Sequence, residues 1–96
     1  MLLVLDVGNT NIGLGLFQGE GLLHHWRIAT RREGTSDEYA ILLRNLLEGV
    51  KAPLDAIDGV MMASVVPPLD GTLAEMASKV MAVPKSTTMA GPPYLV

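Results

Sequence analysis

The chain opens with Met1-Leu2-Leu3-Val4-Leu5-Asp6-Val7-Gly8-Asn9-Thr10-Asn11. The apolar run 2–5 is short and rich in β-compatible residues, which favours a buried strand over a helix. A carboxylate such as Asp6 at the end of a buried strand is unfavourable unless a group such as a cation pairs with it. Gly8 allows close backbone approach, and the polar residues after it can hold phosphate oxygens. An ordinary β-turn is the alternative, since Asp, Gly and Asn are common turn residues.

Composition narrows the range of functions. The 96 residues are 49% hydrophobic, which suits one small domain with a real core. The net charge of −3 and the pI near 5.1 give no electrostatic case for nucleic acid. With no cysteine, disulfides and thiolate chemistry are excluded. No apolar run approaches the length of a membrane span, and the start lacks the basic segment of a signal peptide.

Two more strands are predicted after the turn. Residues 12–17 form a strand in which Gly13 and Gly15 share one face, and close packing against a helix and ligand approach explain this equally well. Residues 22–30 form the next strand, so the first three strands read as an antiparallel meander. Its predicted faces place Leu22, His24, Trp26 and Ile28 together and Leu23, His25 and Arg27 on the opposite side. The adjacent histidines therefore do not suit one metal ion.

A helix, a strand and a second helix are predicted to follow. Thr35-x-x-Glu38 is a capping box that begins the first helix, and Gly49 ends it. Residues 60–66 read as a buried strand that lies parallel to its neighbour, because it follows a helical crossover. Ser64 within it has no histidine base placed by the sequence, so a catalytic nucleophile is not favoured. Pro67 and Pro68 suit the first turn of the second helix. Apolar residues at helical spacing are predicted to face the core in both helices. They are Tyr39, Leu42, Leu43, Leu46 and Val50 in the first helix, and Leu69, Leu73, Met76, Ala77 and Val80 in the second.

Four stretches together resemble one known family. Asp6-Val7-Gly8-Asn9-Thr10-Asn11 resembles the first phosphate motif of type III pantothenate kinases, which belong to the superfamily of acetate and sugar kinases, heat-shock chaperone ATPases and actin. The other stretches are Trp26-Arg27-Ile28-Ala29-Thr30, Thr35-Ser36-Asp37-Glu38-Tyr39-Ala40 and Ala63-Ser64-Val65-Val66-Pro67-Pro68-Leu69. All four occur in the family's order with similar spacing. The resemblance covers residues 1–81 and weakens after them.

The resemblance implies an α/β fold and a kinase activity. The fold is an actin-like, ribonuclease-H-like domain, with a mixed sheet that opens with the meander and continues with alternating helix and strand. Residues 1–81 would be the N-terminal subdomain, residues 82–96 an irregular tail in which 94–96 could form a strand stub, and the second kinase domain would be absent. The implied activity is ATP-dependent phosphorylation of pantothenate, the first step towards coenzyme A. Members are cytoplasmic homodimers that use magnesium and a monovalent cation, potassium or ammonium.

The resemblance also assigns roles to residues. Asp6 would act through the metal, and the ATP-binding set would be Asp6, Val7, Gly8, Asn9, Thr10, Asn11, Ile12 and Gly13. The family's catalytic aspartate lies in a Gly-x-Asp-Arg motif that these residues do not contain, so no catalytic residue is predicted in this chain. Tyr94 lies near the position of a family tyrosine that touches substrate, although its neighbours differ.

Three interpretations remain open. The first is a truncated N-terminal portion of the kinase that supplies the phosphate-binding loop and is inactive alone. The second is a non-catalytic nucleotide-binding or transcriptional-regulator-like protein of the same fold. The third is an unstable gene fragment, in which the fourth strand exposes an edge that a fifth would normally cover. In every case ATP and pantothenate are the expected ligands of the intact family, and neither nucleic acid nor membrane is an expected partner.

Overall fold

The computed structural model describes residues 1–81 and 87–89. Its regular elements are β1 (Leu2–Val7), β2 (Asn11–Gln18), β3 (Gly21–Ala29), α1 (Ser36–Gly49), β4 (Gly59–Ser64), α2 (Asp70–Val80) and β5 (Thr87–Met89), with 3-10 helices η1 (Leu54–Ala56) and η2 (Pro67–Leu69). The five strands form one sheet in the order β3-β2-β1-β4-β5. Strands β1, β2 and β3 are antiparallel neighbours, whereas β4 is parallel to β1. The predicted meander and the predicted parallel strand are both confirmed.

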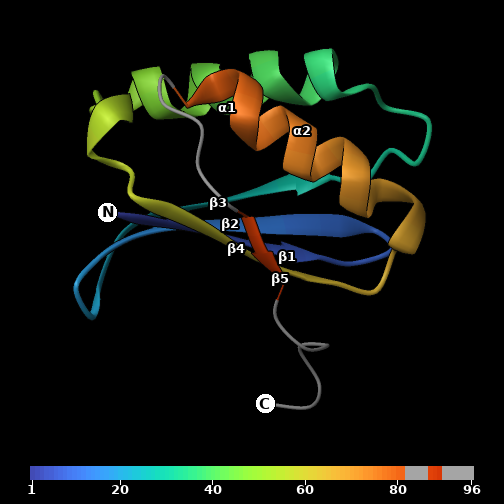
Figure 1. Ribbon diagram of the computed structural model, residues 1–96, viewed down its shortest axis with the longest axis horizontal. Coiled ribbons are helices and arrows are strands. Elements are labelled where there is room, and N and C mark those ends of the chain that lie inside the picture. The colour runs from blue at the N-terminus through green and yellow to red at the C-terminus, as the bar shows by residue number, and fades with distance from the viewer. Residues whose placement is uncertain (82–86, 90–96) are drawn as a thin grey trace.

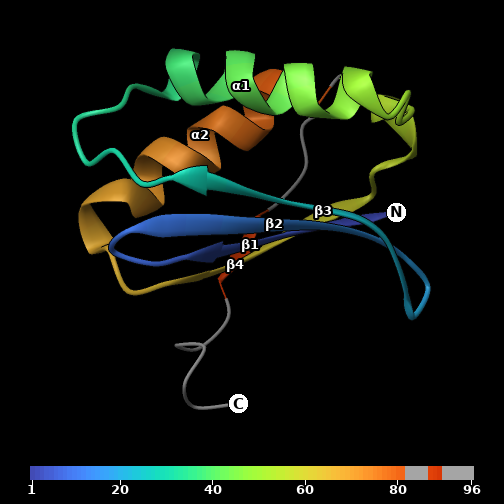
Figure 2. The ribbon, with the colours of Figure 1, turned by 180° about the vertical axis from the view of Figure 1, so that it is seen from behind.

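Both helices cover the same face of the sheet, as the two opposite views show (Figures 1 and 2). Alternation along β1 sends Leu3, Leu5 and Val7 towards the helices, and all three are buried. In β2 the corresponding side chains are Ile12, Leu14 and Leu16. The core therefore lies between one side of the sheet and α1 and α2. Among the described residues, no helix covers the other side, which is called the open face below.

Helix α1 begins as its sequence predicts. The Thr35 side chain accepts a hydrogen bond from the Glu38 N–H, and the Glu38 carboxylate accepts one from the Thr35 N–H. These two bonds form the predicted capping box.

The buried side of α1 differs in part from the predicted apolar stripe. The buried residues of the helix are Tyr39, Ala40, Leu43 and Leu47, whereas Leu42, which the stripe includes, is 38% exposed. The stripe is rotated because α1 lies against α2 on one side and has an open flank on the other.

Helix α1 ends at Gly49, as predicted. The left-handed position after a helix, which usually takes glycine, is occupied here by Lys51, with φ of 55°. The Ala52 N–H donates to the Leu47 carbonyl, and the Lys51 N–H donates to the Glu48 carbonyl. This pair of bonds is a Schellman motif with lysine in place of glycine.

The second helix follows its sequence pattern closely. The predicted core-facing residues are all buried: Leu69, Leu73, Met76, Ala77 and Val80. Pro67 and Pro68 lie in η2, a single 3-10 turn that leads directly into α2. Because proline has no backbone N–H to donate, it suits this first turn. Lys79 near the end of α2 bonds to Asp37 at 2.7 Å and so ties the two helices together.

One predicted strand face is wrong at its beginning. The pairing of β2 with β3 shifts between Leu16 and Phe17, so that Leu22 pairs with Phe17 and His24 pairs with Leu16. Leu23 is the extra residue of a β-bulge at this point. The bulge reverses the side of the sheet on which the side chain before it, that of Leu22, lies. Leu22 therefore lies on the open face beside Gly15, and not with His24 and Trp26 on the helical side.

Strand β5 lies inside the segment that the sequence pattern predicts as irregular. It pairs in parallel with β4 through the backbone of residues 87–89. The edge of β4, which the interpretation as an unstable fragment expects to be exposed, is thus partly paired. A three-residue strand shows too little alternation to be recognised from sequence. The possible strand at 94–96 and the candidate Tyr94 lie outside the described residues.

Candidate functional site

The turn between β1 and β2 is closed by its own backbone. The Gly8 N–H donates to the Asn11 carbonyl at 2.9 Å. A Cβ atom at Gly8 would lie 3.1 Å from that carbonyl oxygen, tighter than nearly all real contacts. The close approach within the turn therefore favours glycine here, whether or not a ligand binds.

Neighbouring segments hold the turn from two sides. After β3, the Thr30 hydroxyl donates to the Gly8 carbonyl at 2.7 Å, and the Thr30 N–H donates to the Thr10 carbonyl at 2.9 Å. Arg32 donates to the Asn9 side-chain oxygen at 2.8 Å. After β4, the Val65 N–H donates to the Val7 carbonyl at 3.0 Å. The turn is thus a fixed platform, which a site that binds by positioning needs.

The tip of this platform carries free donors. Among the described residues, the N–H groups of Asn9 and Thr10 make no hydrogen bond, and neither does the Thr10 hydroxyl nor the Asn11 side chain. All three residues are exposed. Backbone N–H groups and small polar side chains that converge at a turn are suited to binding anions such as phosphate.

Asp6 lies on the open face, and its side chain is exposed. The expectation that its carboxylate lies in a buried strand is wrong, because β1 is buried on its helical side only. Because water solvates the carboxylate, its charge is tolerated without a bound cation. The case for a ligand comes from placement instead. Asp6 borders a cavity of about 410 Å³ whose other lining residues are Gly8, Asn9, Thr10, Asn11, Gly13 and Arg27.

The remaining predicted residues divide into two groups. Val7 and Ile12 have fully buried side chains in the core, so only their backbones are available to a ligand. Gly13 lies on the open face, where a Cβ atom would meet only the Asp6 Cβ, at 3.8 Å. Gly15, by contrast, lies 3.3 Å from Leu22 and 3.4 Å from Phe17 by the same measure. Packing of side chains thus explains Gly15, while Gly13 leaves space beside the carboxylate. Neither glycine packs against a helix.

Other candidates have structural roles. His24 stacks on Trp26 with ring centroids 5.9 Å apart, while His25 lies on the open face. The two histidines point to opposite sides, as predicted. Within residues 1–81 and 87–89, no group of three or more His, Cys, Asp or Glu side chains could hold a metal ion. The Ser64 hydroxyl accepts a hydrogen bond from the Val66 N–H at 3.0 Å and so stabilises the turn after β4.

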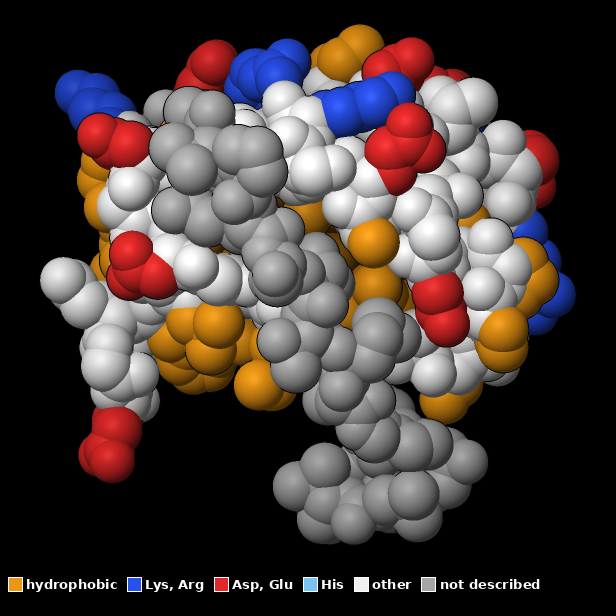
Figure 3. Space-filling view, viewed as in Figure 1, with side chains coloured by type: hydrophobic (Ala, Val, Ile, Leu, Met, Phe, Trp, Pro, Cys, Tyr) orange, Lys and Arg blue, Asp and Glu red, His pale blue; other side chains and the backbone are white. Residues whose placement is uncertain are grey.

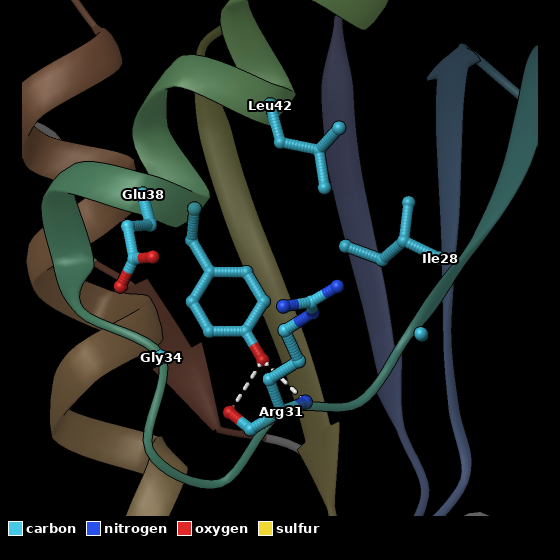
Figure 4. Close-up of a pocket in the computed structure, with 7 residues that line it drawn as sticks. Ile28, Arg31, Gly34, Glu38 and Leu42 are labelled. Atoms are coloured by element: carbon cyan, nitrogen blue, oxygen red, sulfur yellow. Dashed lines mark hydrogen bonds between the residues drawn. The ribbon is translucent and has the colours of Figure 1, made fainter.

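A second cavity, of about 430 Å³, lies between α1 and the end of β3 and was not foreseen from sequence. The Tyr39 hydroxyl donates to the Arg31 carbonyl at 2.8 Å and accepts from the Arg31 N–H at 2.9 Å. Ile28 and Leu42 point towards each other in this space, and the Arg31 guanidinium extends towards them from the loop (Figure 4). A Cβ atom on Gly34 would lie only 2.7 Å from the Tyr39 ring. The two hydrogen bonds of Tyr39 thus clamp the loop before α1 beside this cavity.

Charged and apolar side chains are interspersed on the face that Figure 3 shows. Acidic side chains are scattered over it, Lys and Arg side chains lie along its upper and right margins, and apolar side chains form patches between them. Among the described residues, the exposed large apolar side chains are Leu22, Leu23, Ile41, Leu42 and Met61. No helix in the described part of the chain is both long and apolar enough to cross a membrane.

Solved structures share the fold at low sequence identity. YeaZ from Pseudomonas aeruginosa matches 94% of this chain and 43% of its own, with a TM-score of 0.62 and 17% identity. RuvC from Thermus thermophilus, solved in complex with a Holliday junction substrate, matches 95% of this chain and 64% of its own, with a TM-score of 0.58 and 18% identity. The expected actin-like, ribonuclease-H-like α/β fold is confirmed.

Sequence comparison is more specific than the fold. A relative from Halalkalibacterium halodurans is 49% identical over 79 residues, and one from Moorella thermoacetica is 52% identical over 79 residues; both are named type III pantothenate kinase. These matches cover 82% of this chain and 31% of each relative, so the chain spans about a third of their length. The model of the family described as type III pantothenate kinase matches residues 2–92. On this match over nearly its whole length, the chain belongs to the type III pantothenate kinase family.

Proposed function

We propose that this chain supplies the ATP-phosphate and magnesium site of an enzyme that phosphorylates pantothenate. The observation that carries the proposal is the braced turn, whose tip presents the free N–H groups of Asn9 and Thr10 beside the exposed carboxylate of Asp6. Phosphoryl transfer depends mainly on positioning and on neutralising phosphate charge. Pantothenate is proposed as the substrate because the chain belongs to the type III pantothenate kinase family.

The donor set fits magnesium and phosphate. Magnesium in such sites is bound through one or two carboxylates, with waters and substrate phosphates completing its shell. A single carboxylate such as Asp6 is therefore enough, and a cluster of protein ligands is not needed. When bound, the ion would neutralise phosphate charge. Asp6 would hold it, and residues 8–11 with the backbones of Val7, Ile12 and Gly13 would orient the phosphates.

Calorimetric titration with ATP and magnesium tests this site. We expect the 96-residue chain to bind ATP·Mg and the Asp6→Asn variant to lose binding, because the metal loses its carboxylate. Asp55→Asn is the matched control, since Asp55 is an exposed carboxylate in η1. Equal binding by wild type and Asp6→Asn, or no binding by either, would contradict the proposed site.

Catalysis by these 96 residues alone is not expected. The family's catalytic aspartate belongs to a Gly-x-Asp-Arg motif, which this sequence does not contain. Pantothenate-dependent formation of ADP by the purified chain would overturn this expectation. ATP binding without such turnover would also fit the alternative of a non-catalytic nucleotide-binding protein. Adding the complementary part of a related kinase distinguishes the two, because only a kinase portion should restore turnover.

The remaining family properties are proposals as well. They are a homodimer, a cytoplasmic location and a requirement for potassium or ammonium. A homodimer would bury exposed apolar side chains such as Ile41 and Leu42 of α1. Sedimentation equilibrium checks the dimer, and a single-species monomer at high concentration would contradict it.

A further inference from the structure

Arg27 lies in line with the candidate phosphate site. Strand pairing places Arg27 of β3 opposite Gly13 of β2, and Gly13 opposite Asp6 of β1. The three residues form a row across the open face, and adjacent strands lie about 4.8 Å apart. Because Gly13 has no side chain, nothing in this row stands between the carboxylate and the arginine. Asp6 and Arg27 both line the cavity of about 410 Å³ beside the turn.

The charges in this cavity are complementary to a metal–phosphate group. Among the described residues, Asp6 is the only acidic one that lines the cavity and Arg27 the only basic one. No ion pair or hydrogen bond of the Arg27 guanidinium occurs within the described residues, and its side chain is exposed. Arg32, the other arginine near the turn, is already bonded to Asn9. A guanidinium is a planar fork of donors that matches phosphate oxygens.

The anchoring of β3 supports a defined position for this arginine. Trp26 and Ile28, its neighbours in sequence, pack against the core on the helical side. Because side chains alternate along a strand, the Arg27 side chain between them must point to the open face. A structural role is the competing explanation: the stem of Arg27 could simply cover apolar surface near Phe17 and Leu22.

We propose that Arg27 is a phosphate-binding residue, which contacts nucleotide phosphate oxygens across Gly13 from the metal that Asp6 would hold. The proposal rests on the proposed function, because it needs a nucleotide phosphate at the turn. It adds a cation from a separate strand to a loop that otherwise offers only N–H groups and neutral side chains.

Calorimetry on the 96-residue chain, with ATP·Mg and adenosine as probes, tests the proposal. Arg27→Gln should weaken ATP·Mg binding by about 10- to 100-fold, the range for a lost charged hydrogen bond. Arg27→Lys keeps the charge without the fork and should lose less. Adenosine has no phosphate, so its binding should not change. Arg44→Gln is the matched control, because Arg44 is exposed on α1 and its one hydrogen bond within the described residues goes to the Lys79 carbonyl at 3.4 Å.

Thermal melting of each variant separates binding from folding. If Arg27→Gln melts early, Arg27→Met replaces it, because methionine keeps an apolar stem over the sheet without the charge. ATP·Mg binding by Arg27→Gln or Arg27→Met equal to wild type, with Asp6→Asn defective, would overturn the role of Arg27 and leave the proposed function standing. No ATP·Mg binding by the wild type would overturn both.

Discussion

Gly13 offers a way to separate the stability of the sheet from ligand binding. It lies in the interior of β2, where a glycine lowers stability by roughly 0.5–1 kcal/mol relative to alanine. An added Cβ would be 3.8 Å from the Asp6 Cβ, an ordinary van der Waals contact. Gly13→Ala therefore adds no clash, and we expect it to stabilise the chain by about 0.5 kcal/mol. For a domain of this size that is a rise in Tm of roughly 2–4 °C.

The same methyl group should weaken ATP·Mg binding. It would project from the strand between Asp6 and Arg27, into the cavity that the phosphates would fill. Gly13→Val, which also suits a strand, should weaken binding further, because its branched side chain fills more of that space. Urea unfolding gives the stability, and calorimetry with ATP·Mg gives the affinity.

Two other glycines are compared with Gly13, Gly15 as a control for binding and Gly8 for the stability of the turn. Gly15→Ala brings its Cβ within 3.3 Å of a flexible Leu22 side chain, away from the cavity beside the turn, so binding should be unchanged. Gly8→Ala would press on the Asn11 carbonyl at 3.1 Å and should destabilise the turn by about 1 kcal/mol, the net contribution of its hydrogen bond. The reasoning is refuted if Gly13→Ala binds ATP·Mg as tightly as wild type, or if it melts earlier.

Three further predictions concern the helical layer. Lys51→Gly should stabilise the chain by about 1 kcal/mol, measured by urea unfolding, because glycine takes φ of 55° without strain; no gain would contradict the strained end of α1. Tyr39→Phe should destabilise it by about 1–3 kcal/mol, since both backbone groups of Arg31 lose their partner, and an unchanged urea midpoint would argue against the clamp. Hydrogen bonds from the backbone and side chain of Thr35 hold the pKa of the Glu38 carboxyl below its ordinary value of 4.5. The ionised Glu38 therefore stabilises the folded chain above pH 4.5, and this stabilisation is lost as the pH falls through the pKa of Glu38 in the folded chain. Glu38→Gln should therefore reduce the loss of stability on acidification, and parallel pH profiles for the two proteins would contradict this.

The sequence pattern was most reliable where one physical preference acts alone. The apolar spacing of α2 predicted all of its buried face, because the helix packs on the core along one side only. The capping box predicted the start of α1 from Thr35 and Glu38. The parallel placement of β4 followed from the handedness and length of a helical crossover.

Tertiary effects account for the differences. A bulge opposite Phe17 moved Leu22 to the open face, and nothing in local alternation indicates a bulge. Helix α1 is buried along residues 39, 40, 43 and 47, since contact with α2 selects one side of a helix that is apolar on more than one side. The exposure of Asp6 depends on which sheet face the helices cover, and a strand's own residues do not determine that. Strand β5 was missed because its three residues are set by pairing with β4.

The contacts of the turn explain why four separate stretches of sequence occur together. Thr30, at the end of the Trp26–Thr30 stretch, holds both Gly8 and Thr10. Val65, in the Ala63–Leu69 stretch, holds Val7. The loop between Thr30 and Thr35 leads into α1. Tyr39 of α1 holds this loop through two hydrogen bonds to the backbone of Arg31. A simple β-turn needs none of these braces, because the Gly8–Asn11 bond already closes it. Contacts to one short turn from the segments after β3 and after β4, with the first segment held by α1, are what a site needs when its donors must stay fixed.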